Sequence, residues 1–529
     1  MDEVRFVFEA LTRHNFFPNQ KSGVGELPPI FSTRKFTPEI ANLIADVGSP
    51  DGRGRFGFDL VEYSATRYNN VPRVLGIPHP KAYGRLVRTI IDNWESIRHV
   101  CDNESSKIKP YFHADNRLMV MNYEGFREKV IDKCKKSFGK RFLVDTDISG
   151  CFNSIYTHAI EWAGVGVAES KEGLATGANS KHWSKLLDSA QARTRRGETQ
   201  GITIGPATSS VIVELILSKV DGALEGFEFS RYVDDYVCYC SDSAEADKFL
   251  RVLASELKRY KLSLNLGKTK IDSLPSAIQT DWISKLHAAL PVFDDDGRYQ
   301  SEVVMRYIEY AISLNEQTPD GSVLKYAIRQ VVYRIEKRSA SIIADYFVNL
   351  SWHYPLLLPF IGLLFELHEF EYSEYEERFN LIVFENARNS RSDGMCWPLY
   401  FMHKYNMKLD DHVFNEVVAS RDCLALCVMM VITGWNEKLE SLANDIASKS
   451  DYDKDQQWVF LYQAFLKGYI QNPYQDPCFE IMREECVDFM PIDDSKSRAE
   501  NYCVYLYASQ VFSPKEKTMS YKEYVQKHP

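Results

Sequence analysis

Several features that would narrow the class of this 529-residue chain are missing. Its most apolar stretch, residues 354–367, is interrupted by Pro355 and Pro359, whereas a membrane span needs about 20 apolar residues. The N-terminus, MDEVRFVFEA, lacks the basic-then-apolar pattern of a signal peptide. No Cys-x-x-Cys pair occurs among the 11 cysteines, which favours buried thiols over zinc sites or disulfides. We therefore expect a globular protein of the cytoplasm with no membrane partner.

An excess of positive charge is also lacking, since the net charge is −10. The charged residues are unevenly distributed along the chain. Residues 1–275 hold 38 Lys and Arg against 35 Asp and Glu, a net +3, which leaves −13 for residues 276–529. The first part can therefore offer phosphates a neutral-to-basic surface. Ordinary variation in surface composition explains the asymmetry equally well.

Residue patterning divides the chain at the same place. Residues 141–274 alternate short apolar strands with helical segments, as in an α/β or α+β domain, and residues 275–296 resemble a junction. After residue 302, helical patterns follow one another as in a solenoid or irregular helical array. A chain of this length is too long to fold around a single hydrophobic core. We therefore expect two domains, residues 1–275 and 276–529. The helices expected in the second part span residues 303–314, 322–337, 341–350, 373–387, 411–432, 436–447, 456–470 and 498–511.

Acidic residues end two β-type segments. The apolar run 142–144 precedes Asp145 and Asp147, and the pair Asp234-Asp235 lies between two further β-type runs. Adjacent carboxylates in a sheet repel each other unless a cation neutralises them, and Mg²⁺ prefers oxygen ligands of this kind. Two ions about 3.5–4 Å apart can activate a 3′-hydroxyl and stabilise a leaving pyrophosphate. Taken alone, however, an Asp-Asp pair is more often a solvated turn.

A glycine-bearing segment lies between the two acidic segments. Residues 199–209, TQGITIGPATS, contain Gly201 and Gly205, which permit a closely approaching backbone, and Pro206, which is suited to start a helix over 211–220. Alone, this pattern is that of a loop entering a core helix. Between two acidic strand ends, it predicts the wall of a site for a nucleotide and template.

In this order, the segments resemble the motifs of a reverse transcriptase. Asp147, with Phe152 five residues on, resembles motif A, and residues 200–209 resemble motif B. Tyr232-Val233-Asp234-Asp235 resembles the YxDD box of motif C, and residues 264–270 resemble motif D. The resemblance covers about residues 60–275 and implies an α+β reverse-transcriptase palm and fingers. Asp145 is the alternative for motif A, but Gly150, not an aromatic residue, lies five residues beyond it.

The resemblance implies a catalytic centre. Asp147, Asp234 and Asp235 would be catalytic. With the backbone oxygen of Ile148, they would bind two Mg²⁺ ions, or Mn²⁺ in their place.

Further residues would bind the substrate, by the same resemblance. Phe152 would lie under the sugar as a steric gate that favours dNTPs, although the neighbouring Gly150-Cys151 is smaller than the family's common residues. Gln200 and Gly201 would flank the base and sugar. Lys268, with Lys270 as the alternative, would contact the triphosphate or donate a proton.

Cations upstream occupy the position of the fingers. The cations expected to contact the triphosphate or strand phosphates are Arg67, Arg73, Lys81 and Arg85. The attraction between a cation and a phosphate is stronger in a water-poor cleft. A solvated or structural role is the alternative for each of them.

Residues 65–83, in the fingers position, together with residues 146–149 and 154–160, resemble the abortive-infection reverse transcriptases of bacteria, the AbiK, AbiA and P2-prophage group. This resemblance implies anti-phage defence, DNA synthesis without a template, and priming by a protein hydroxyl. The single-stranded DNA product would then be attached through one of the 30 tyrosines, none of which the sequence singles out. It also implies homo-oligomers and an all-α HEAT-like helical domain after the palm.

Two other functions remain open. A conventional RNA-templated reverse transcriptase of the retron or group II intron type would share the motifs, but we find no endonuclease or zinc segment. A catalytically silent nucleic-acid-binding scaffold would use the helical part alone. The complete set of three carboxylates argues against a silent palm.

Overall fold

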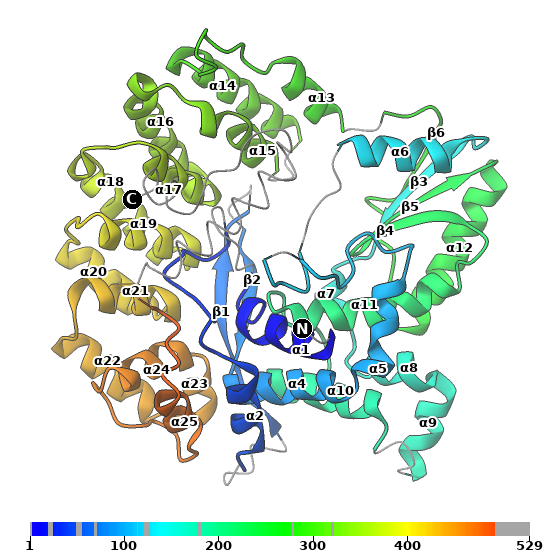
Figure 1. Cartoon of the computed structure of the whole chain (residues 1–529), viewed down its shortest axis with the longest axis horizontal. Helices are drawn as coiled ribbons and strands as arrows, with labels where there is room; N and C mark the ends of the chain where they lie inside the picture. The colour runs from blue at the N-terminus through cyan, green and yellow to red at the C-terminus, as the bar shows by residue number, and fades with distance from the viewer. Residues whose placement is uncertain are drawn as a thin grey trace.

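The computed structural model describes residues 3–18, 25–48, 56–67, 71–113, 115–120, 126–176, 181–277, 280–318 and 322–491. Within these ranges, every strand lies before residue 274, and only helical elements follow. The chain thus consists of an α+β region and a helix-rich region, as the sequence predicts (Figure 1).

A four-stranded antiparallel sheet forms the centre of the α+β region, in the order β4-β5-β3-β6. Asp147 lies directly opposite Asp235 in the β3–β5 pair. Strands β4 and β5 form a hairpin whose turn is only Val233-Asp234. The sheet therefore brings the two acidic segments of the sequence to one end. The strands are β3 (Phe142–Asp147), β4 (Glu228–Tyr232), β5 (Asp235–Cys240) and β6 (Lys270–Ser273).

The two faces of this sheet are covered differently. Val144 points to one face and is fully buried, and helices α11 (Ala207–Gly222) and α12 (Ser243–Arg259) lie on that side. Because successive side chains point to opposite faces of a strand, Asp147 and Asp235 belong to the other face.

Helix α6 (Phe126–Ser137) lies on the face that carries the carboxylates. The Lys136 ammonium donates to the Phe229 carbonyl at 3.4 Å. The Lys129 ammonium lies 5.9 Å from the centroid of the Tyr232 ring, and Tyr232 is the strand partner of Asp235. Helix α6 therefore covers part of this face, as far as the strand position opposite Asp235.

A β-hairpin, β1 (Leu60–Ala65) and β2 (Arg73–Pro78), joins the central sheet to the helix-rich region. In Figure 1 it lies between the two. Helix α4 (Pro80–Asp92) follows, and it begins where Pro80 stands at the first helical position and the His79 ring accepts the Lys81 N–H. The remaining elements of the α+β region are α5 (Trp94–Ile97), η2 (Arg98–Asp102), α7 (Cys151–Ser154), α8 (Ala159–Val165), α9 (Val167–Thr176), α10 (Trp183–Ala192) and η3 (Arg193–Arg195).

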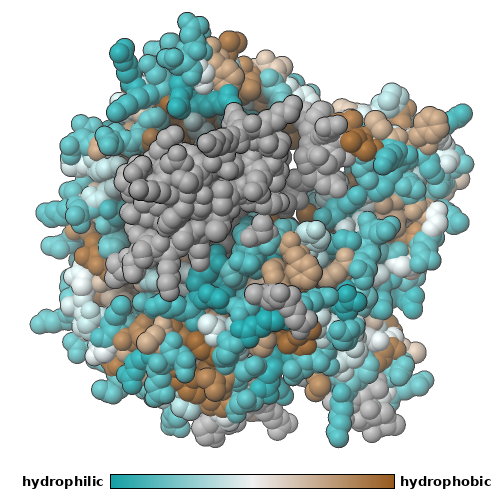
Figure 2. Space-filling view, in the orientation of Figure 1, coloured by the Kyte–Doolittle hydropathy of each residue, from teal (hydrophilic) through white to brown (hydrophobic). Residues whose placement is uncertain are grey.

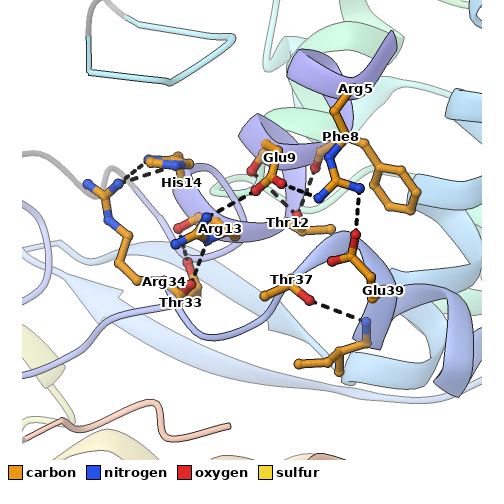
Figure 3. A network of polar contacts seen from close by, with 11 residues as sticks. Arg5, Phe8, Glu9, Thr12, Arg13, His14, Thr33, Arg34, Thr37 and Glu39 are labelled. Carbon is orange, nitrogen blue, oxygen red and sulfur yellow. Dashed lines mark hydrogen bonds and ion pairs between the residues drawn. The ribbon is translucent and has the colours of Figure 1, made fainter. Parts of the chain in front are cut away.

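The N-terminal segment supports the same region from the other side. Figure 3 shows Arg5 between Glu9 and Glu39, to both of which it bonds at 2.5 Å, so that helix α1 (Glu3–Glu9) is tied to helix α2 (Pro38–Asp46). Just beyond, the Asn15 carbonyl accepts the N–H of Ala207 at 3.0 Å, the first residue of α11. The helical elements of this segment are α1 (Glu3–Glu9), the π-helical turn η1 (Ala10–His14) and α2 (Pro38–Asp46).

The helix-rich region is a stacked array that curves along one side of the molecule (Figure 1). Helix α18 packs on α19 and α20, α19 packs on α21, and α21 packs on α24. The elements are α13 (Asp281–Ala288), α14 (Ser301–Gln317), α15 (Ser322–Val331), η4 (Val332–Arg334), η5 (Lys337–Ser339), α16 (Ala340–His353), η6 (Pro355–Leu357), α17 (Leu358–Leu367), η7 (Tyr372–Tyr375), α18 (Glu376–Arg388), α19 (Ser392–Lys404), α20 (Asp411–Ser420), α21 (Cys423–Thr433), α22 (Glu437–Ala447), α23 (Asp451–Asp455), α24 (Trp458–Leu466) and α25 (Cys478–Glu484).

Most predicted helices are confirmed, and two differ. The helix expected over 322–337 ends at Val331 and is followed by the 3₁₀ turns η4 and η5. The helix expected over 411–432 is two helices, because Arg421 adopts a left-handed conformation at φ 55° and Asp422 caps a new helix by accepting the Ala425 N–H. Helices α13, α19, α23 and α25 lie outside the predicted ranges, and α19 contains Pro398. The helix expected over 498–511 lies outside the described residues.

The β1–β2 hairpin is bonded to the helical array along its length. The indole N–H of Trp458 donates to the Ile77 carbonyl at 3.2 Å. At the other end, both the N–H and the hydroxyl of Thr66 donate to one oxygen of the buried Asp393, at 2.9 and 2.6 Å. The array therefore holds both ends of the hairpin.

The surface in Figure 2 is mainly hydrophilic, with small separated hydrophobic patches. Among the helices that the structure describes, none is both long enough and apolar enough to cross a membrane.

Candidate active site

The three predicted carboxylates meet at one end of the central sheet. Asp147 ends β3, Asp235 begins β5 directly opposite, and Asp234 lies in the turn between β4 and β5. The backbone N–H of Ile148 donates to the Asp234 carbonyl at 3.2 Å, which joins the two acidic segments. The sheet thus assembles the acidic centre that the sequence predicts.

Electrostatic repulsion is built into this centre. Loss of hydration, followed by the charges of Asp234 and Asp147, raises the pKa of Asp235 to about 6. Loss of hydration and the charge of Asp147 also raise the pKa of Asp234. The nearby cations Lys268 and Arg73 lower the pKa of Asp234, and Lys268 lowers that of Asp235, but they do not offset the rise.

Asp145 has a different environment from Asp147. Its strand partners are Val237 and Lys270. Burial, and then the charge of Asp272, raises its pKa. Since Asp147 is the residue opposite Asp235, the geometry favours Asp147 for the motif A position.

The turn that carries Asp234 is strained. Val233 has φ 61°, a left-handed conformation that a β-branched side chain rarely adopts. Such a residue costs about 1–3 kcal/mol and persists only where its surroundings hold it. The Val233 carbonyl accepts a hydrogen bond of 2.8 Å from the Arg231 guanidinium.

The motif A and motif B segments are joined by backbone hydrogen bonds. The Ile202 N–H donates to the Phe152 carbonyl at 2.8 Å, and the Gly201 N–H donates to the Ile155 carbonyl at 2.7 Å. Gly201 has φ 82°, a backbone conformation that favours glycine. Phe152, Gly201 and the adjacent Gln200 are thereby brought together.

Arg73 and Arg67, two of the cations expected to bind substrate, lie at different positions relative to the acidic centre. Arg73 begins β2 and lies close enough to the acidic centre to lower the pKa of Asp234. Strand β2 reaches this position by docking on the motif B loop, where the Gly76 N–H donates to the Ile204 carbonyl at 2.9 Å. Arg67 is exposed, two residues beyond the end of β1.

Lys81 does not lie at the acidic centre, which corrects the expectation that it binds substrate. Its side chain is fully buried and forms an ion pair of 3.2 Å with Asp476 in the helix-rich region. The ammonium also donates to the Gly48 carbonyl at 2.7 Å. Arg85 is likewise engaged, by the carbonyls of Ala45 and Val47. A fully buried, paired ammonium contacts no substrate in this conformation.

Lys268 is the basic residue of motif D that reaches the carboxylates. Its ammonium lies 2.5 Å from one oxygen of Asp147, and that bond raises the pKa of Lys268. The segment is held there because the Asn265 N–H donates to the Asp147 carbonyl at 2.8 Å. Lys270 lies further along, opposite Asp145.

The oxygen donors of this centre are of the type that a divalent cation binds, although they are not arranged around one ion in this structure. As the chain stands, no three Asp, Glu, His or Cys side chains among the described residues converge closely enough to hold an ion. One oxygen of Asp147 bonds to Lys268, while the other is buried and has no hydrogen-bond partner in the described part of the chain. A buried carboxylate oxygen without a partner, beside two further carboxylates, is a ligand set for a hard cation.

Sequence reasoning missed the residues behind the centre. Arg231 is fully buried and bonded to Glu214, Asp221 and the Val233 carbonyl. Its place directly before Tyr232 in the YxDD box was the available signal.

Comparison with known proteins agrees with this geometry. Residues 81–283 match the family model of the reverse transcriptase (RNA-dependent DNA polymerase). The chain therefore contains a reverse transcriptase domain. The sheet β4-β5-β3-β6 lies within the matched residues, and we call it the palm sheet. No curated protein sequence matches the chain.

Solved structures similar to the chain include telomerases from yeasts. Apo telomerase from Candida tropicalis is 10% identical, with 80% of this chain and 76% of that chain covered and a TM-score of 0.30. Telomerase from Candida albicans in complex with a TWJ fragment of telomeric RNA is 12% identical, with 82% and 71% covered and a TM-score of 0.28. A Candida tropicalis telomerase truncated from its C-terminal domain is 13% identical, with a TM-score of 0.28; the match covers 44% of this chain and 52% of that chain. Likeness this weak supports no shared activity or partner.

Proposed function

We propose that the chain is a DNA polymerase that uses Mg²⁺, with Mn²⁺ as an alternative, to join dNTPs to a hydroxyl nucleophile. The observation that carries this proposal is the pairing of Asp147 with Asp235, with Asp234 in the turn beside them. Asp147, Asp234, Asp235 and the backbone oxygen of Ile148 would hold two ions. When bound, the ions would activate the nucleophile and stabilise the pyrophosphate.

The chain's own residues would orient the nucleotide. Phe152 would lie under the sugar and select dNTPs, with Gln200 and Gly201 at the base and sugar. Arg73 and Lys268 would contact the triphosphate. This role is supported by their electrostatic effect on the neighbouring carboxylates. Lys268 would have to leave Asp147 when an ion binds there. Arg67 remains a further candidate at the end of the hairpin.

We propose further that synthesis needs no template. A product strand has to leave across the face from which the carboxylates project. Helix α6 lies on that face, with Lys136 bonded to Phe229 and Lys129 near Tyr232. A single strand needs less of this face than a duplex does, so the covering helix supports single-stranded synthesis.

The biological role that we propose is anti-phage defence by abortive infection in the bacterial cytoplasm. It rests on the resemblance of residues 65–83, 146–149 and 154–160 to the abortive-infection reverse transcriptases. By the same resemblance, a tyrosine primes synthesis and stays attached to the DNA, the helical array is HEAT-like, and the chain forms homo-oligomers. The stacked helices α18 to α24 support the HEAT-like assignment.

Incubation of the purified protein with labelled dNTPs and Mg²⁺, without nucleic acid, tests the proposal. We expect labelled DNA that stays with the protein until protease treatment. The matched control is Asp234→Ala with Asp235→Ala, which should make none. Product that forms only with an added RNA template and primer would favour a conventional templated reverse transcriptase. No product under either condition would remove the enzymatic proposal and favour a nucleic-acid-binding scaffold.

The protein–DNA adduct locates the primer. Mass spectrometry after nuclease digestion should show a nucleotide on one tyrosine. An unmodified chain beside free DNA would contradict protein priming while leaving polymerisation intact.

A further inference from the structure

A buried polar network lies directly behind the turn of the YxDD box, on the face of the palm sheet opposite the carboxylates. At its centre is Arg231 in β4, whose side chain is 0% exposed. The guanidinium donates to both oxygens of Glu214, at 2.8 and 2.9 Å, and to Asp221 at 2.8 Å, both from helix α11. Its Nε–H also points to Asp221, at 3.0 and 3.1 Å from the two carboxylate oxygens. A further bond of 2.8 Å goes to the Val233 carbonyl.

The acidic partners of Arg231 are themselves held in place. The Tyr236 hydroxyl donates to one oxygen of Asp221 at 2.9 Å, and the Asn103 amide donates to the other at 2.7 Å. The Arg231 backbone is held as well, since its N–H donates to the Ser105 carbonyl at 2.8 Å. The guanidinium is thus fixed in position.

Stability alone is a weak reason for such a network. A buried ion pair or triad can often be replaced by apolar residues of similar volume without loss of stability. Two carboxylates around one cation also leave a net negative charge in the core. The network is therefore better explained by the hydrogen bond from Arg231 to a backbone carbonyl. This bond holds the backbone of the strained Val233.

We propose that Arg231 is a positioning residue, which holds the strained turn and thereby directs the Asp234 and Asp235 carboxylates toward the metal position. A left-handed valine reverts to an ordinary conformation unless its surroundings oppose this. Reversion at Val233 would turn the peptide that leads into Asp234. The bond from Arg231 to the Val233 carbonyl opposes this rotation. This inference rests on the proposed function only for its catalytic consequence.

A guanidinium is required for this task. Its planar fork can bond to Glu214, Asp221 and Val233 at the same time, whereas a lysine ammonium is a compact point charge on a flexible stem. Arg231→Lys therefore keeps the charge and most of the volume but loses the simultaneous contacts. It is the informative variant.

The test is a double-variant cycle with two measurements. Arg231→Lys is prepared alone and together with Val233→Gly, because glycine adopts the left-handed conformation without strain. Mn²⁺ affinity is measured by titration calorimetry, and kcat and KM for dNTPs are measured in the DNA synthesis assay. Circular dichroism gives the folded fraction, to which each value is normalised.

We expect Arg231→Lys to lower kcat about 10- to 100-fold and to weaken Mn²⁺ binding, with little change in KM, because misplaced groups lose rate more than binding. In the Val233→Gly background, the same substitution should cost less than about threefold, since the turn no longer needs to be held. Equal losses in both backgrounds, or unchanged Mn²⁺ affinity, would overturn the proposal.

The matched control is Asp476→Asn, which breaks another fully buried ion pair, that with Lys81. It should lower stability and leave Mn²⁺ affinity unchanged. Should Arg231→Lys fail to fold, Glu214→Gln loosens the same guanidinium at constant size, and the same outcomes apply. A wild-type protein that binds Mn²⁺ but makes no DNA would sink the proposed function and leave the metal-binding cycle valid.

Discussion

Arg231 and Lys81 are both fully buried cations with carboxylate partners, and they serve different regions of the molecule. Arg231 bonds within the palm, to two residues of helix α11 and to the turn that carries Asp234. Lys81 bonds across regions, to Asp476 of the helix-rich part. The same chemistry thus orients a site in one place and joins two regions in the other.

The difference teaches that burial and pairing alone do not identify a functional cation. What separates the two is the backbone carbonyl that each cation also contacts. For Arg231, it is the carbonyl of the strained Val233, next to Asp234, and for Lys81 it is the carbonyl of Gly48. Variants near each cation should therefore affect different measurements.

The largest effect on the palm side should come from the carboxylates themselves. Asp234→Ala with Asp235→Ala should lower DNA synthesis about 1,000-fold or more, since both are expected metal ligands. Stability should not fall, because the substitutions remove two carboxyl groups whose pKa is raised by burial and by neighbouring negative charge. Product formation and thermal unfolding measure the two quantities. Retained synthesis would show that the carboxylates are not catalytic.

On the side of Lys81, the large effect should be on stability. Asp476→Ala leaves a buried ammonium without its partner and should cost about 3–5 kcal/mol of unfolding free energy. Denaturant unfolding measures this cost. The dNTP KM of the folded fraction should stay within about threefold of the wild-type value. A large rise in KM would restore Lys81 to the substrate site.

The contact between the hairpin and the helical array should depend on pH through Asp393. Burial raises the pKa of Asp393 from 3.8 to about 6. The folded state then binds the proton more tightly than the unfolded state, so stability falls as pH rises from about 4 to about 6 and is level above that. A shift of this size corresponds to about 3 kcal/mol.

Asp393→Asn should flatten this part of the pH profile. Unfolding by denaturant at pH 4, 5, 6 and 7 measures it in both proteins. An identical slope in the variant would mean that Asp393 is ionised throughout.

The smallest effect should come from relieving the turn. Asn adopts the left-handed conformation more readily than valine, so Val233→Asn should raise stability by about 0.5–1 kcal/mol. DNA synthesis should not rise with it, because the gain comes from relief of strain alone. A loss of stability would show that the Val233 side chain packs in a way that outweighs its backbone conformation.

The acidic centre could be predicted from the sequence because its determinants are local. Carboxylates at the ends of β-type runs, with a glycine-bearing loop between them, fix which side chains meet once the strands pair. The partner of Lys81 lies 395 residues away, and no local pattern indicates that Asp476 will bury it. Glu214 and Asp221 likewise resemble ordinary helix residues until Arg231 is placed beside them.

The helices show the same limit. Amphipathic patterning finds most of the array, but a left-handed Arg421 divides one predicted helix without any glycine or proline to mark the break. Helix α19 was missed because Pro398 and Gly394 argue against a helix. A Cβ at Gly394 would lie 2.2 Å from the Asn386 side chain, so this glycine reflects close packing of α18 and α19.

The hydrogen bonds between the helical array and the β1–β2 hairpin limit how the chain can be truncated. Ile77 and Thr66, at the two ends of the hairpin, depend on Trp458 and Asp393 for their bonds. A fragment cut after residue 283 would keep every polymerase motif and lose the scaffold that fixes Arg73 near Asp234. Truncation and cassette exchange are therefore poor ways to isolate catalysis, and point substitutions in the intact chain are the better tool.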